Sequence, residues 1–121
     1  MGGTSIFVVD DDASVRRSLA RLLKVTGFDV ETFGTAEEFL EGNLRNPSCL
    51  IVDVHLPGMD GVELQHRIAE TEPELPVVAI SGLGEKSTRQ RSLEAGASAF
   101  LEKPFSDEEL LDAIQKAIAR P

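Results

Sequence analysis

Charged and hydroxyl-bearing side chains stand directly after the short apolar runs of this sequence. The groups that follow these runs are Asp10-Asp11-Asp12, Asp53, Ser81 and Glu102-Lys103-Pro104. If the runs are parallel strands joined by right-handed crossovers, their carboxyl ends lie along one edge of a sheet. We therefore expect one site that contains several carboxylates, a hydroxyl and an ammonium group.

Such a cluster of side chains suits metal-assisted phosphoryl chemistry. Carboxylates that lie close together repel one another and are driven toward protonation unless a cation compensates their charge. Oxygen ligands suit a hard ion, and Mg²⁺ commonly takes one or two carboxylates together with a phosphate oxygen. Asp53 could then act as a nucleophile that forms an acyl phosphate. Lys103 and Ser81 could neutralise and orient the phosphoryl oxygens.

Each of these residues also has a purely structural interpretation. A single Asp within residues 10–12 is more often a helix cap or a turn residue, and we assign the capping role to Asp12. Ser81 could simply end a strand, and Lys103 could simply precede a turn. Asp53 is harder to explain in this way, because charges on apolar strands are seldom left unpaired. The coincidence of these strand-end positions favours the functional interpretation.

The segments that must position these residues alternate between apolar runs and stretches of helical period. This alternation predicts βα units and a mostly parallel sheet in an α/β fold. The segment 30–33 alternates more than the others, which indicates a strand toward an edge. The predicted strands are 6–9, 30–33, 50–54, 77–80 and 99–101.

Capping signals mark the limits of several predicted helices. The first helix is expected to end at Gly27, which suits a left-handed cap. The fourth helix, around residues 85–95, has Leu93 as its only large apolar residue, so we expect it to be held weakly. Capping boxes are predicted for the second and fifth helices, at Thr35 with Glu38 and at Ser106 with Glu109.

Composition narrows the class of protein. A chain of 121 residues with 41% hydrophobic residues fits one globular domain, which we expect over residues 1–121. The single cysteine, Cys49, lies in an apolar run and is expected to be buried and inert in a reducing compartment. We expect no signal peptide, no membrane span and a cytoplasmic location. The net charge of −9 argues against direct contact with nucleic acid.

The order and spacing of the strand-end motifs resemble the receiver domain of two-component response regulators. The motifs are Val8-Val9-Asp10-Asp11, Val52-Asp53 with Leu56-Pro57-Gly58-Met59-Asp60-Gly61, Ile80-Ser81, and Lys103-Pro104-Phe105. The resemblance spans nearly the whole chain, and the stretches 81–85 and 101–105 are most similar to FixJ-type receivers. It implies a flavodoxin-like, doubly wound fold with a five-stranded parallel sheet in the order 2-1-3-4-5.

The resemblance also implies a role for each residue of the site. Asp53 would be the phosphoacceptor, and Ser81 and Lys103 would contact the phosphoryl group. The Lys103-Pro104 peptide bond would be cis, a form that is common only before proline. The implied Mg²⁺ ligands are Asp11, Asp53 and the backbone carbonyl of His55, with Asp10 acting through water.

A switch and its partners follow from the same resemblance. Phosphorylation would draw Ser81 inward and let Phe100 swing toward the vacated space. The fourth helix, fifth strand and fifth helix would then present a new surface, often for homodimerisation. A sensor histidine kinase would supply the phosphoryl group, and a C-terminal DNA-binding output domain commonly follows such receivers.

Two residues in or beside these motifs carry hypotheses of their own. Ser81 stands where many relatives have Thr, so the hydroxyl remains but the methyl group that restricts its rotamer is lost. We hypothesise that His55, two residues after Asp53, tunes the lifetime of the phosphoryl group. The other histidine, His66, is expected to lie on a solvated helix surface.

The sequence is also compatible with other functions. An aspartyl-nucleophile phosphatase also uses an Asp at a strand end, but Asp53-Val54-His55 lacks a second carboxylate and no insertion could form a substrate cap. A single-domain response regulator acting through protein contacts, or a binding module that is never phosphorylated, would keep the same fold. The receiver interpretation predicts no classical enzyme, since such a domain catalyses at most its own phosphorylation and dephosphorylation. The sequence contains neither a complete Gly-rich phosphate loop nor a dinucleotide fingerprint, so we expect no nucleotide binding.

Overall fold

The computed structural model describes residues 4–41, 47–56, 58–82 and 86–119, in which strands and helices alternate. The strands are β1 (Ser5–Val9), β2 (Asp29–Phe33), β3 (Cys49–Asp53), β4 (Val77–Ser81) and β5 (Ala99–Glu102). The helices are α1 (Ala13–Thr26), α2 (Ala36–Glu41), α3 (Gly61–Thr71), α4 (Lys86–Glu94) and α5 (Asp107–Ile118). Within the described ranges, no helix combines the length and the apolar character that crossing a membrane requires.

The strands form one parallel sheet in the order β2-β1-β3-β4-β5. This order confirms the predicted doubly wound, flavodoxin-like topology. The strand β2 lies at an edge, and its alternating exposure agrees with its alternating sequence. Because β1 lies between β2 and β3, the order reverses there, and the carboxyl ends of β1 and β3 adjoin at the switch point of the sheet.

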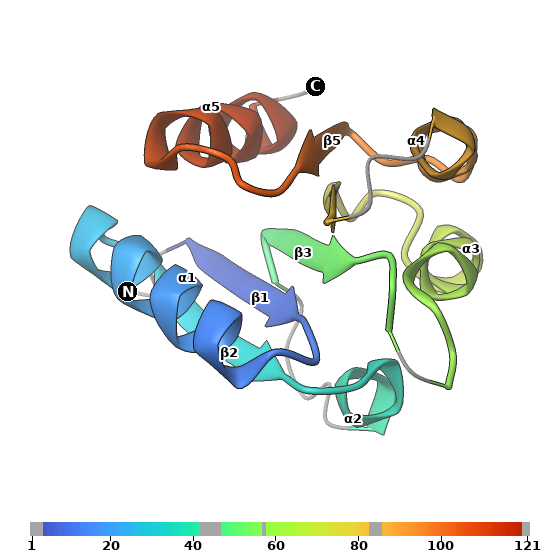
Figure 1. Cartoon of the computed structure of the whole chain (residues 1–121), viewed down its shortest axis with the longest axis horizontal. Coiled ribbons are helices and arrows are strands. Elements are labelled where there is room, and N and C mark those ends of the chain that lie inside the picture. Colours follow the sequence, from blue (N-terminus) through green and yellow to red (C-terminus); the bar gives the residue numbers. More distant parts are fainter. Residues whose placement is uncertain (1–3, 42–46, 57, 83–85, 120–121) are drawn as a thin grey trace.

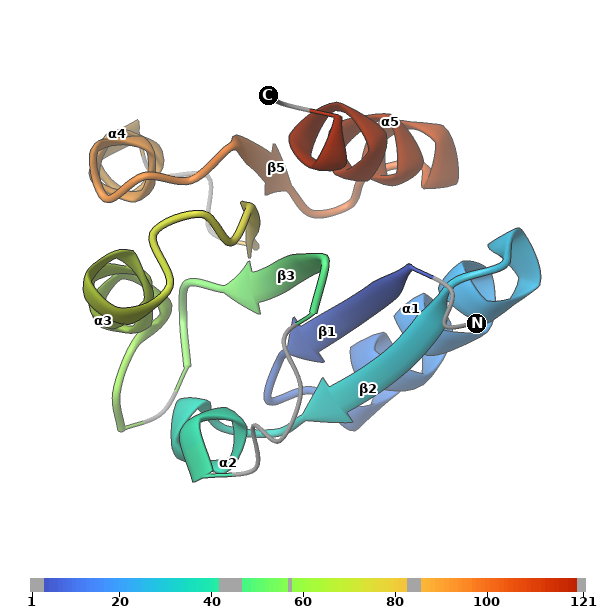
Figure 2. The ribbon, with the colours of Figure 1, turned by 180° about the vertical axis from the view of Figure 1, so that it is seen from behind.

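Helices cover both faces of the sheet, as Figures 1 and 2 show. The helices α1 and α5 lie on one face, where Ile6 and Val8 of β1 pack with Leu23 and Ile114. On the other face, Phe7 of β1 belongs to a second cluster with residues of α2 and α3. Since successive strand residues point to opposite faces, a strand covered on both sides must be apolar throughout, as the central runs are.

The helix ends largely follow the predicted caps. Asp12 accepts hydrogen bonds from the backbone of Ser14 and Val15 at the start of α1, and Gly27 ends the helix with a φ of 110°. Ser106 and Glu109 form the predicted capping box of α5. At α2 only one half of the predicted box is present. Thr35 Oγ1 accepts from the Glu38 amide, but the Glu38 carboxylate accepts from the amide of Gly34 rather than from that of Thr35.

The buried face of α4 is polar. Its only large apolar residue, Leu93, is 39% exposed, whereas Thr88 and Ser92 are buried. Gln65 of α3 donates a hydrogen bond from Nε2 to the Ser92 carbonyl at 3.0 Å. Among the described residues, Gln65 Oε1 and Ser92 Oγ are buried without a hydrogen-bond partner. Buried polar atoms without partners are costly, so α4 gains little stability from this interface.

Candidate functional site

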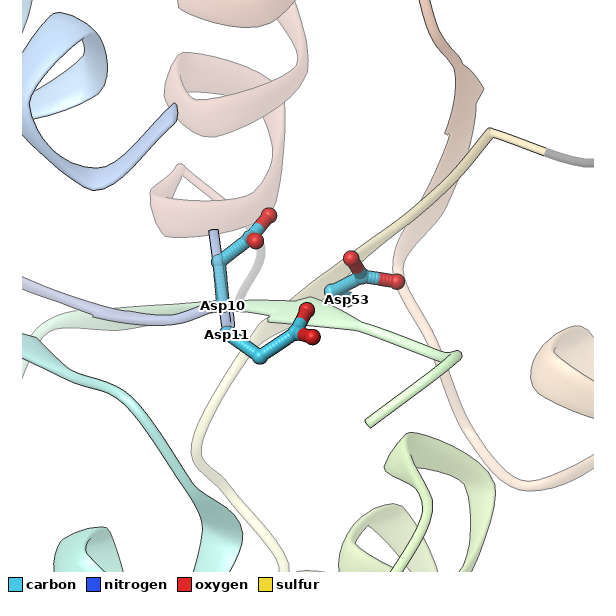
Figure 3. Close-up of side chains that lie close together, drawn as sticks. All are labelled: Asp10, Asp11 and Asp53. Carbon is cyan, nitrogen blue, oxygen red and sulfur yellow. The ribbon is translucent and has the colours of Figure 1, made fainter. Parts of the chain in front are cut away.

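Three carboxylates meet at the switch point of the sheet. Asp10 and Asp11 follow β1, and Asp53 is the last residue of β3, so strand pairing brings them together. One ligand atom from each of the three side chains lies within 4.8 Å of the others. Figure 3 shows the three side chains close together. Asp10 and Asp53 are buried and Asp11 is exposed. The expected convergence of these strand-end carboxylates is therefore present.

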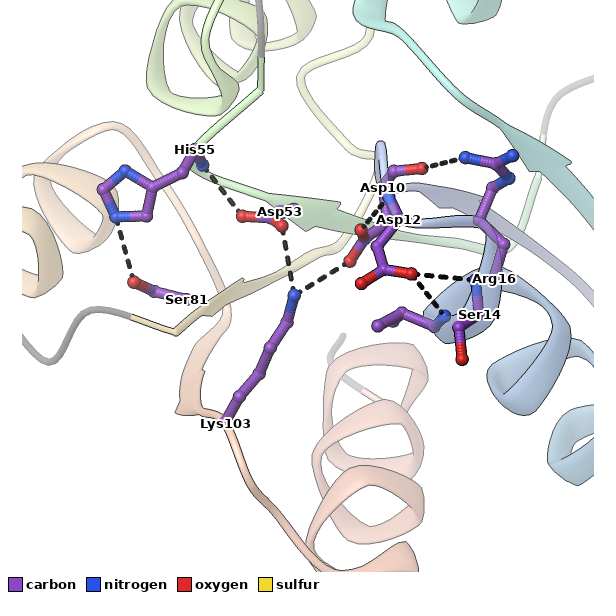
Figure 4. A network of polar contacts seen from close by, with 9 residues as sticks. Asp10, Asp12, Ser14, Arg16, Asp53, His55, Ser81 and Lys103 are labelled. Carbon is purple, nitrogen blue, oxygen red and sulfur yellow. Dashed lines mark hydrogen bonds and ion pairs between the residues drawn. The ribbon is translucent and has the colours of Figure 1, made fainter.

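Lys103 connects two of these carboxylates. Its Nζ lies 3.1 Å from Asp10 Oδ2 and 3.1 Å from Asp53 Oδ2 (Figure 4). The Lys103 side chain is 26% exposed, whereas the Asp10 side chain is fully buried. The peptide bond from Lys103 to Pro104 is cis, as the family resemblance implied. A single ammonium group therefore neutralises part of the charge of the cluster.

Backbone amides hold the remaining oxygen of each buried carboxylate. Asp10 Oδ1 accepts from the Asp12 amide at 2.9 Å, and Asp53 Oδ1 accepts from the His55 amide at 2.8 Å. In both cases the donor lies two residues after the carboxylate, the arrangement of an Asx-turn. Each carboxylate is thus fixed by an amide on one oxygen and by Lys103 on the other.

The electrostatics of the site reflect the excess of negative charge. Burial raises the pKa of Asp10 and the charge of Asp53 raises it further, although the Asp12 amide and Lys103 oppose these effects. Burial alone would lower the pKa of Lys103, but the carboxylates of Asp53 and Asp10 outweigh it, so this pKa is raised. Lys103 therefore remains a cation, and it is a single ammonium group beside three carboxyl groups.

Helix α3 begins in direct contact with the backbone of the site. The Gly61 amide donates to the Val54 carbonyl at 3.2 Å, and Asp60 caps the helix by accepting from the Glu63 amide. A Cβ atom on Gly61 would lie 2.5 Å from the Asp53 carbonyl oxygen. Only glycine permits this close approach without displacing the strand end that carries Asp53.

Ser81 and Phe100, the predicted switch residues, lie beyond β3 in the sheet. Ser81 is fully buried at the end of β4, and its Oγ lies 3.1 Å from Nε2 of the His55 ring. Phe100 of β5 is 8% exposed and packs in a cluster with Val54 and other residues. The guanidinium carbon of Arg89 lies 6.0 Å from the centre of the Phe100 ring.

A cavity of about 380 Å³ opens beside the carboxylates. Asp11 and His55 line it from the site, and Thr88 and Arg91 line it from α4. The cavity therefore connects the carboxylate cluster with the helix whose buried face is polar.

Some contacts of the site were not anticipated from the sequence. Arg16 Nη1 donates to the Asp10 carbonyl at 2.6 Å, which ties α1 to the acidic loop. A cation near a helix N-terminus interacts unfavourably with the helix dipole. The position of Arg16 in the sequence therefore indicates that its side chain has another partner. His66, by contrast, is exposed as expected. The motif residues Pro57, Leu83, Gly84 and Glu85 lie outside the described residues.

The donor set fits a hard divalent cation. All side-chain ligand atoms of the cluster are carboxylate oxygens, which Mg²⁺ prefers over nitrogen or sulfur. Burial, and then the charge of Asp53, raise the pKa of Asp10 despite the contact with Lys103, so a further cation beside Asp10 would favour its charged form. The chemistry of the residues is therefore that of a site that gains from a further cation.

Known proteins are similar to this chain over most of its length. The family model of the response regulator receiver domain matches residues 6–115. Nodulation protein W of Bradyrhizobium diazoefficiens is 42% identical over 116 residues, which cover 95% of this chain and 51% of that protein. The transcriptional regulatory protein FixJ of the same organism is 40% identical over 115 residues, 93% of this chain and 56% of that protein.

A solved structure agrees with these relatives. The crystal structure of FixJ-N has a TM-score of 0.89 and 35% identity, over 100% of this chain and 98% of that one. The chain spans about half the length of the two curated relatives that it matches.

Proposed function

The chain belongs to the response regulator receiver domain family, and from this membership we propose that Asp53 is its phosphoacceptor. The observation that carries the proposal is the position of Asp53, which is held between an amide and Lys103 beside two further carboxylates. We further propose that residues 1–121 form one such domain.

The proposed reaction is transfer of a phosphoryl group to the Asp53 carboxylate. A carboxylate oxygen attacks phosphorus and forms the new P–O bond, while the bond from phosphorus to the donor breaks. With a phosphohistidine donor the leaving imidazole nitrogen takes the electron pair, and the ring later gains a proton from solvent. The hydrogen bond from the His55 amide to Asp53 Oδ1 orients the nucleophile before the donor arrives.

We assign the Mg²⁺ ligands to Asp11, Asp53 and the backbone carbonyl of His55, with Asp10 acting through water. When bound, the ion would neutralise charge that develops on the phosphoryl oxygens. Lys103 Nζ lies 3.1 Å from Asp53 Oδ2. If the phosphoryl group is bonded to that oxygen, Lys103 would donate a hydrogen bond to a phosphoryl oxygen. Ser81 would donate a second hydrogen bond to the phosphoryl group, and Lys103 would keep its contact with Asp10.

The phosphoacceptor assignment is tested by intact mass. The protein is incubated with acetyl phosphate and Mg²⁺, and we expect one added phosphoryl group per chain. Asp53→Asn should take up none, because an amide is a much weaker nucleophile. Omission of Mg²⁺ should slow the uptake strongly. Uptake that persists in Asp53→Asn would refute the assignment, and continuous release of phosphate from an ester would favour the phosphatase alternative.

The switch is proposed to act on α4, β5 and α5. Ser81 would move toward a phosphoryl group on Asp53, and Phe100 would respond in the space beside it. The two helices of this surface carry complementary charge, since α4 has Lys86, Arg89 and Arg91 whereas the first turn of α5 is acidic. This complementarity supports a phosphorylation-dependent homodimer, which light scattering before and after phosphorylation would test.

The wider role of the protein is also a proposal. A sensor histidine kinase would be the phosphodonor, in the cytoplasm, and we propose that a C-terminal DNA-binding output domain carries the response. The names of the matched relatives, one of them a transcriptional regulatory protein, support this role, as does their greater length. The net charge of −9 indicates that the receiver itself does not contact DNA. A single-domain regulator that acts through protein contacts is the alternative.

A further inference from the structure

The side chain of His55 contacts the hydroxyl that is assigned to the phosphoryl group. His55 follows β3 and Ser81 ends β4, and their side chains meet with 3.1 Å between Nε2 and Oγ. Figure 4 shows the Ser81 hydroxyl pointing toward the His55 ring and away from Asp53 and Lys103. Ser81 is fully buried, whereas His55 is exposed.

The residue type at position 81 makes this contact important. A threonine has a methyl group on Cβ that restricts its rotamer, whereas the serine hydroxyl can rotate among all staggered positions. A hydrogen bond from outside the residue can therefore decide where the Ser81 Oγ lies. The imidazole of His55 provides that bond in either neutral tautomer, because a hydroxyl both donates and accepts.

The surroundings of His55 leave room for its ring to leave Ser81. The ring lines the cavity of about 380 Å³ that also contacts Asp11, Thr88 and Arg91. The His55 side chain is exposed, whereas the backbone amide of the same residue is fixed by Asp53. The backbone of His55 can thus keep its place in the site while its side chain changes partner.

We propose that the His55 side chain is a positioning residue that holds the Ser81 hydroxyl in its resting place and competes with the phosphoryl group for it. This inference rests on the proposed function of Asp53 and adds a second control to it. Breaking the contact between His55 and Ser81 is part of the cost of the active state. Loss of the His55 ring therefore favours the active arrangement.

The contact itself is tested by nuclear magnetic resonance of the histidine ring nitrogens. The chain has only two histidines, so the exposed His66 serves as the internal control. Ser81→Ala should shift the Nε2 resonance of His55 and leave the His66 ring unchanged. If neither ring responds, the contact is absent in solution and the proposal is overturned. This measurement does not depend on phosphorylation.

The competition is tested with beryllofluoride, a phosphoryl analogue, and Mg²⁺ in a double-mutant cycle followed by calorimetry. From the net free energy of a typical hydrogen bond, we expect His55→Ala to bind beryllofluoride about 2- to 10-fold more tightly than the unsubstituted chain. His55→Gln, whose amide can still reach Ser81, should restore part of the resting affinity. His66→Ala should leave the affinity unchanged.

The Ser81→Ala background separates competition from other effects of the ring. In that background His55→Ala should no longer change the affinity, because no hydroxyl remains to be released. An equal change in both backgrounds, or no change in either, would overturn the proposal. If the unsubstituted chain binds no beryllofluoride and gains no phosphoryl group, the proposed function of Asp53 fails instead, whatever the ring nitrogens show.

Discussion

Replacement of Lys103 by methionine isolates the charge of the ammonium group that connects the two buried carboxylates. Methionine keeps most of the apolar stem of the lysine, so packing changes little. Asp10 and Asp53 would then lie buried beside each other with no side-chain cation between them, and the Asp10 side chain has no exposed surface. We expect Lys103→Met to lower the free energy of unfolding at neutral pH in the absence of Mg²⁺.

The expected loss follows from the two contacts. A pair of charges 3.1 Å apart attracts by about 5 kcal/mol at an effective dielectric constant of about 20. Much of this attraction is offset by dehydration, and the Lys103 side chain keeps 26% of its surface exposed. Removing one partner of a buried pair leaves an uncompensated charge, for which we expect a loss of ~2–4 kcal/mol.

The loss should depend on pH in a defined direction. The pKa of Asp10 is already raised above its ordinary value of 3.8, and removal of the ammonium raises it further. Between the ordinary and the raised value, the folded protein binds more protons at Asp10 than the unfolded chain does. The free energy of unfolding therefore falls as pH rises through this window. The loss caused by Lys103→Met should be smallest below the window.

Urea unfolding followed by circular dichroism measures this loss, because the chain contains no tryptophan or tyrosine. Lys116→Met is the matched control, since Lys116 also lies 3.1 Å from a carboxylate, that of Asp112, but on the exposed surface of α5. The control should lose less than ~0.5 kcal/mol. Mg²⁺ should restore Lys103→Met more than it stabilises the unsubstituted chain. Equal stability of Lys103→Met and the control in EDTA, at every pH, would refute this reasoning.

Other parts of the structure give shorter tests. Gly61→Ala should lower the free energy of unfolding by ~1–3 kcal/mol in urea, because its Cβ would lie 2.5 Å from the backbone of residues 53–54. Gly82→Ala, whose Cβ meets Lys103 only at 3.8 Å, should lower it much less. Backbone amides of α4 should exchange with deuterium faster than those of α1, and equal protection would contradict weak anchoring of α4. The Cys49 thiol, with a pKa raised by burial to about 12, should react with a thiol reagent only after unfolding.

The strands could be predicted because each central run is apolar on both faces, a pattern that few structures other than a covered strand require. The exact ends of the strands could not be predicted. The ladder also includes Ser5 and Asp29 at its start and Glu102 at its end, since backbone pairing does not depend on side-chain polarity. The order of the strands came from the family resemblance, because alternation alone does not determine which strands are neighbours. The structure and the family match confirm that resemblance.

The sequence predicts which strand ends meet at the site, but it predicts the individual side-chain contacts less well. Sheet geometry alone brings Asp10 near Asp53, whereas the cis bond at residues 103–104 was implied by the family resemblance. The hydrogen bond between His55 and Ser81 depends on side-chain rotamers at two strand ends, which periodicity does not encode. The half-formed cap of α2 likewise depends on where one carboxylate turns.

The contact between Lys103 and Asp10 joins residues that are 93 positions apart in the chain. During synthesis Asp10 is therefore made long before the lysine that compensates it. During that interval the growing chain carries the acidic loop without its partner. Burying the carboxylates between the first strands is then unfavourable, because no ammonium group compensates their charge. The domain should consequently complete its folding only after β5 has emerged, and an N-terminal fragment should accumulate as an open, protease-sensitive species.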